Sequence, residues 1–63
     1  MIQVKTTILS KIIKSKKDFL LYDINEKGIL INYILTNDFK RKKEFDGFRV
    51  VSTIQANHEF VKI

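Results

Sequence analysis

The chain contains no cysteine, so it cannot form a disulfide, and its single histidine excludes a zinc site of the usual cysteine and histidine type. It has no proline and only two glycines, and no part of it resembles a flexible linker. The longest apolar run, residues 29–35, is interrupted by Asn32 and is too short to span a membrane. Residues 1–17 lack the features of a signal peptide. We therefore expect residues 1–63 to form one domain in the cytoplasm, with no membrane partner.

The composition is that of a small folded domain with a positive charge. Hydrophobic residues make up 44% of the chain, which is enough for an apolar core and argues against disorder. The formal net charge is +5, and a basic domain of this size often binds a polyanion such as nucleic acid. A genome rich in A and T also raises the number of lysines. Charge alone therefore does not decide between a nucleic-acid partner and a well-solvated surface.

Residues 18–24 and 29–36 have the pattern of a β-hairpin. The residues between them suit a type I turn that starts at Asn25 and is closed by Gly28 in the left-handed region. With that turn, one face of the hairpin is entirely apolar, and we expect it to be buried. Its expected cross-strand pairs are Ile24 with Ile29, Tyr22 with Ile31, and Leu20 with Tyr33. The opposite, mixed face is expected to be exposed and carries Phe19, Leu21, Asp23, Leu30, Asn32 and Ile34.

Residues 2–13 fit two kinds of secondary structure. Their alternation and their many β-branched residues favour a strand. A helix is the alternative, because Ile8, Leu9, Ile12 and Ile13 also have helical spacing.

The second half of the chain is predicted to continue in strands after one irregular segment. Asp38 can cap a short helix near residues 38–45. Alternation then predicts a strand over residues 48–56, a tight turn at residues 57–58 and a short last strand over residues 59–63. Five strands in a chain this short would leave long unpaired edges, so we expect an all-β fold that curls into a small five-stranded barrel.

The order of these segments resembles the OB-fold, as in S1-type domains and bacterial translation initiation factor one. The resemblance is carried by a long first strand leading into residues 14–23, by the strand–turn–strand of residues 19–31, and by the basic connector and glycine turn of residues 40–51. It implies a five-stranded barrel that binds single-stranded nucleic acid or RNA across its second and third strands. A five-stranded SH3-like barrel fits the pattern nearly as well.

The residues that would bind nucleic acid follow from the charge and from the resemblance. Lysines just before the second strand and in the basic connector would neutralise phosphates, and Phe19 would stack on a base. The candidates are Lys11, Lys14, Lys16, Lys17, Phe19, Asn32, Lys40, Arg41, Lys42, Lys43 and Arg49. The alternative interpretation is that these lysines only keep a turn and a connector well solvated.

A protein-interaction module is the second functional hypothesis. Exposed apolar side chains often mark a protein contact, and the mixed hairpin face would present Leu21, Leu30 and Ile34. Such a module could be a phage- or plasmid-encoded protein that modulates a host enzyme, or a subunit that forms a homodimer.

Catalysis and cofactor binding are not expected. His58 has an acidic neighbour in Glu59, but adjacent residues of a strand point to opposite faces. Residues 23–28 begin like a calcium-binding loop, yet Lys27 and Ile34 occupy positions where an oxygen ligand is needed. We therefore expect neither a metal nor a cofactor, and no small-molecule substrate.

Overall fold

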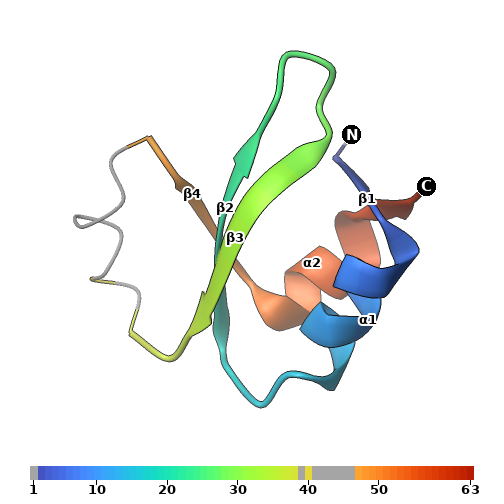
Figure 1. Ribbon diagram of the computed structural model, residues 1–63. Helices are drawn as coiled ribbons and strands as arrows, with labels where there is room; N and C mark the ends of the chain where they lie inside the picture. The colour runs from blue at the N-terminus through green and yellow to red at the C-terminus, as the bar shows by residue number, and fades with distance from the viewer. Residues whose placement is uncertain (1, 39, 41–46) are drawn as a thin grey trace.

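The computed structural model describes residues 2–38, 40 and 47–63 and shows a mixed α/β fold (Figure 1). The elements are β1 (Gln3–Val4), α1 (Thr6–Lys14), β2 (Phe19–Ile24), β3 (Leu30–Thr36), β4 (Arg49–Ser52), α2 (Thr53–Glu59) and β5 (Val61–Lys62). β2 lies between β3 and β4 in an antiparallel sheet, and β1 pairs in parallel with β5. The prediction of an all-β, five-stranded barrel, OB-like or SH3-like, is therefore wrong.

Helix α1 replaces most of the strand that was predicted over residues 2–13, of which only β1 remains. Helical spacing puts Leu9 and Ile12 on one face, where both are buried, whereas a strand would have placed them on opposite faces. No side chain caps the start of the helix, so packing of this apolar face accounts for its stability. None of the helices formed by the described residues is long and apolar enough to cross a membrane.

Helix α2 interrupts the strand that was predicted over residues 48–56. The strand ends at Ser52, whose side-chain oxygen accepts a hydrogen bond from the backbone amide of Gln55 at 3.0 Å and so caps the helix. Ala56 becomes buried and Ile54 exposed, although the strand pattern placed them on the same face. The turn predicted at residues 57–58 lies inside α2, and the last strand is the two-residue β5 rather than residues 59–63.

The β2–β3 hairpin and its turn are confirmed. The Gly28 amide donates to the Asn25 carbonyl oxygen at 3.0 Å, and Gly28 has a φ of 81°. The Asn25 side-chain oxygen accepts from the amides of Lys27 and Ile29 at 2.9 and 3.0 Å, which fixes the turn. Residues 25–28 are called the hairpin tip below.

The register of the hairpin differs from the predicted one. Tyr22 lies opposite Tyr33, two residues further along β3 than expected, and an irregularity between Asp23 and Ile24 places Leu30 opposite Ile24. Such a bulge reverses the alternation beyond it. Leu30 is therefore buried and Ile31 is 51% exposed, the reverse of the prediction for both residues.

The core lies between one face of the three-stranded sheet and the two helices (Figure 1). Its buried members are Val4, Leu9, Ile12, Leu20, Tyr22, Leu30, Ala56 and Phe60. The rings of Tyr22 and Phe60 meet edge to face, with their centroids 5.3 Å apart. Leu21 points to the other side of the sheet and is also fully buried, so the prediction that it is exposed is wrong.

The segment after β3 is described only in part. The Asp38 carboxylate accepts from the Lys40 amide at 2.9 Å, which is the local capping contact expected of Asp38. The rest of the predicted short helix over residues 38–45 lies outside the described residues.

Candidate functional site

Two lysine-bearing segments that are distant in sequence meet at one end of the three-stranded sheet. The Asp18 amide donates to the Asn37 side-chain oxygen at 2.9 Å, which joins the loop before β2 to the loop after β3. The Thr53 hydroxyl donates to the Lys17 carbonyl oxygen at 2.9 Å and fixes the same loop to the start of α2. Figure 1 shows the end of α1, the start of β2 and the end of β3 together at this end of the molecule.

This end, called the basic end below, carries four exposed lysines. They are Lys14, Lys16, Lys17 and Lys40. Two aspartates, Asp18 and Asp38, lie in the same loops and reduce the positive charge without cancelling it. At the opposite end of the sheet, Asp23 and Glu26 outnumber Lys27 in and beside the hairpin tip. Four lysines and two aspartates give the basic end a formal charge of +2, whereas Asp23, Glu26 and Lys27 give the region of the hairpin tip a formal charge of −1, so of these two ends the basic end is the more positive.

The other basic residues that were predicted to bind nucleic acid do not all lie at the basic end. Lys11 is exposed in the last turn of α1, where it and Lys14 also interact favourably with the helix dipole. Arg41, Lys42 and Lys43 lie outside the described residues.

The two predicted uncharged nucleic-acid contacts lie far apart. Phe19 begins β2 at the basic end, is half-buried and lies opposite Thr36 and Ser52. Asn32 is exposed but lies opposite Asp23, toward the hairpin tip. The structure therefore brings Phe19, but not Asn32, to the lysines.

Most of the apolar side chains that were predicted to mark the hairpin face as a protein contact are inaccessible. Leu21 and Leu30 are buried, and only Ile34 of the three predicted protein-contact residues is partly exposed. A protein partner at this face stays a prediction, but two of the three side chains that motivated it cannot touch one.

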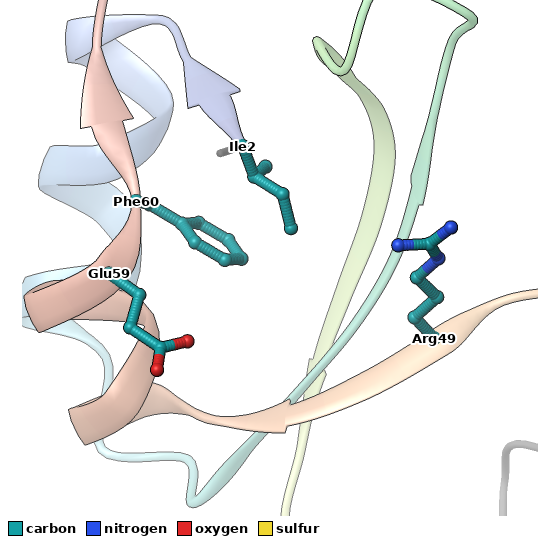
Figure 2. Close-up of a pocket in the computed structure, with 4 residues that line it drawn as sticks. All are labelled: Ile2, Arg49, Glu59 and Phe60. Carbon is teal, nitrogen blue, oxygen red and sulfur yellow. The ribbon is translucent and has the colours of Figure 1, made fainter.

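Arg49 lies away from the basic end, in a groove on the helix side of the sheet. It begins β4 opposite Tyr22, while Ser52 at the other end of β4 lies beside the basic end. Three residues of strand separate the two positions by about 10 Å. Figure 2 shows the Arg49 side chain on one side of the groove, with Ile2, Phe60 and Glu59 on the other.

The groove has a volume of about 500 Å³ and walls of opposite charge. Its apolar surface comes from Ile2 and Phe60, and the Glu59 carboxylate accepts a hydrogen bond from the Gln55 side chain at 3.0 Å. Because Arg49 is balanced there by Glu59, the groove is less attractive to a polyanion than the basic end.

A smaller hollow opens between the two helices beside the basic end. Its lining residues are Ile12, Ile13, Ser15, Thr53, Ile54 and Asn57, and its volume is about 160 Å³. Ile13 is 49% exposed and Ile54 is 74% exposed, which is unusual for isoleucine in so small a domain.

Sequence reasoning missed this hollow because it placed both isoleucines in strands. One signal could have found it. Ser52 followed by Gln55 three residues later is a capping pattern for a helix that contains Ile54.

Comparison of the chain with protein-family models, with curated proteins and with solved structures finds no match to any of them. These comparisons do not test the resemblance to OB-fold domains, which stays a prediction about sequence pattern.

Proposed function

We propose that this domain is a non-catalytic module that binds single-stranded nucleic acid in the cytoplasm through its basic end. The observation that supports the proposal is the meeting of two lysine-bearing loops, joined by the hydrogen bond between Asp18 and Asn37. A set of exposed cations at one end of a small domain is what a phosphate backbone requires of its partner. The proposed surface consists of Lys14, Lys16, Lys17 and Lys40, with Lys11 at its margin.

The proposed contact differs from the one that the resemblance implied. Binding across the second and third strands would need accessible side chains on the hairpin face, whereas Leu21 and Leu30 are buried. The proposed module therefore uses its loops and a helix end to contact phosphates, and Phe19, the predicted stacking residue, lies near enough to assist.

The strength of such binding follows from counterion release. The logarithm of the binding constant falls linearly with the logarithm of salt concentration. Each phosphate that a lysine neutralises on a single strand makes the slope of this line steeper by about 0.7. At about 50 mM salt, each such contact therefore contributes about eightfold in affinity.

The test measures the binding of a fluorescent single-stranded oligonucleotide by anisotropy at several salt concentrations. The variant K16S/K17S removes two cations from the basic end, and K27S removes one from the hairpin tip as a matched control. R49S is a second control, because Arg49 lies in the groove of Figure 2. We expect K16S/K17S to lose affinity by well over tenfold at low salt and to show a salt slope that is shallower by about 1.4, while both controls stay close to the unchanged protein.

Two outcomes would contradict the proposal. Absence of oligonucleotide binding by the unchanged protein at low salt would remove it altogether. If the losses of affinity in K27S and R49S add up to the loss in K16S/K17S, net charge governs binding rather than the basic end.

A further inference from the structure

We propose that the hollow between α1 and α2 receives an unstacked base, so that the module prefers single strands to duplexes. This inference rests on the proposed function, because it assumes that the lysines of the basic end hold the phosphate backbone. The hollow would contact the base itself, whereas the lysines contact only the phosphates.

The hollow has a lining of three isoleucines and three polar residues, and a size that suits one planar ring. Ile13 on α1 and Ile54 on α2 both line it, and both expose about half or more of their surface. Flipped bases are commonly held between apolar or aromatic side chains. Drug-sized ligands need roughly 300–1,000 Å³, so a volume of about 160 Å³ fits a single base better than a larger ligand.

Polar groups at the hollow match the edge of a base. The Asn57 side chain, which offers both a donor and an acceptor, makes no hydrogen bond to any of the described residues. Ser15 lines the hollow as well, and its hydroxyl oxygen accepts from the Lys17 amide at 3.0 Å. Asn57 is therefore the group best placed to hydrogen bond with a base.

The position of the hollow favours a nucleotide as its occupant. Lys14 and Lys16 flank Ser15 in sequence, and Lys17 accepts a hydrogen bond from Thr53, so residues of the lining are joined directly to the basic end. A strand whose phosphates lie on these lysines has its bases within reach of the hollow. Bases of a duplex are stacked and paired inside the helix, whereas single strands can turn a base outward.

The experiment compares the single strand with the duplex of the same sequence. The variants I54S and I13S shorten the side chains that would hold the base, and I31S and I63S shorten isoleucines that are 51% and 53% exposed elsewhere. We expect I54S to weaken single-strand binding by about tenfold, as loss of one stacked base does. Its duplex affinity and salt slope should stay unchanged, and the two controls should bind like the unchanged protein. Thermal unfolding checks that each variant is folded. We expect I54S to be folded because Ile54 is largely exposed.

The outcomes separate this inference from the proposed function. If K16S/K17S weakens binding but I54S and I13S do not, the hollow takes no base, although the basic end still binds phosphates. Equal losses for the single strand and the duplex in I54S would also overturn the inference. Vesicles of phosphatidylcholine and phosphatidylserine provide the last arm. If I54S abolishes vesicle binding but leaves oligonucleotide binding intact, the isoleucines serve an anionic membrane surface instead.

Discussion

Replacing Ser52 with alanine tests the boundary between β4 and α2, which is the part of the fold that differs most from the sequence-based expectation. The Ser52 side-chain oxygen accepts from the Gln55 amide at 3.0 Å. The amides of the first helical turn have no partner within the helix, so S52A leaves one of them without its protein acceptor. Loss of a serine cap costs about 1 kcal/mol in the free energy of unfolding.

Such a loss is large for a domain of this size. A change of about 1 kcal/mol lowers the melting temperature of a domain of 60–100 residues by about 4–8 °C. Ser10 offers a matched control, because it is an exposed serine inside α1. Alanine is the better helix former there by about 0.5 kcal/mol, so S10A should be neutral or slightly stabilising.

Circular dichroism during heating measures both variants, and S52D serves as a rescue because a carboxylate also caps a helix. We expect S52A to melt several degrees lower than S10A and S52D to regain most of the difference. Equal melting temperatures for S52A and S10A would refute the reasoning, since a strand that continued through residues 53–56 would have no cap to lose.

Three further predictions concern the core, the hairpin tip and the basic end. L20A should cost about 2–5 kcal/mol in a urea titration because Leu20 is fully buried, whereas I31A should cost less than about 1 kcal/mol; equal costs would contradict the assigned register. G28A should lower stability by about 1 kcal/mol because Gly28 has a φ of 81°, and G28N should lose less in the same titration. N37A should speed hydrogen exchange at the Asp18 amide, measured by NMR, and N37D should restore protection; unchanged exchange in N37A would mean that this bond does not join the loops.

The hairpin turn was predictable because its causes are local. Asn25 supplies a side-chain acceptor and Gly28 supplies the left-handed residue, and both are visible in the sequence. The register was not predictable, because it depends on the irregularity between Asp23 and Ile24. That one irregularity exchanges the environments of Leu30 and Ile31, and no turn rule anticipates it.

The helices were missed because tertiary packing outweighed local preference. The β-branched residues of α1 favour a strand in isolation, but a helix buries Leu9 and Ile12 together against the sheet. In α2 the alternation of Ile54 and Ala56 is compatible with either structure. The capping pattern that begins at Ser52 was the better signal, and alternation was given more weight.

The candidate site was predictable in its residue types but not in its arrangement. The sequence identifies the lysines before β2 and after β3, yet only the length and pairing of the hairpin bring the two groups to one end. The pairing of β4 with β2 places Arg49 at the end of β4 away from the basic end, although Arg49 is close in sequence to the basic connector. The charge pattern of the sequence therefore identifies the candidate side chains, and strand pairing determines which of them lie close together.

The parallel pairing of β1 with β5 joins the two strands that lie furthest apart in the described chain. The Val61 amide donates to the Ile2 carbonyl oxygen, and the Ile63 amide donates to the Val4 carbonyl oxygen, each at 2.9 Å. β1 and β5 lie at opposite ends of the described chain, whereas β2 and β3 are joined by a short turn, so the hairpin can pair before β1 meets its partner strand.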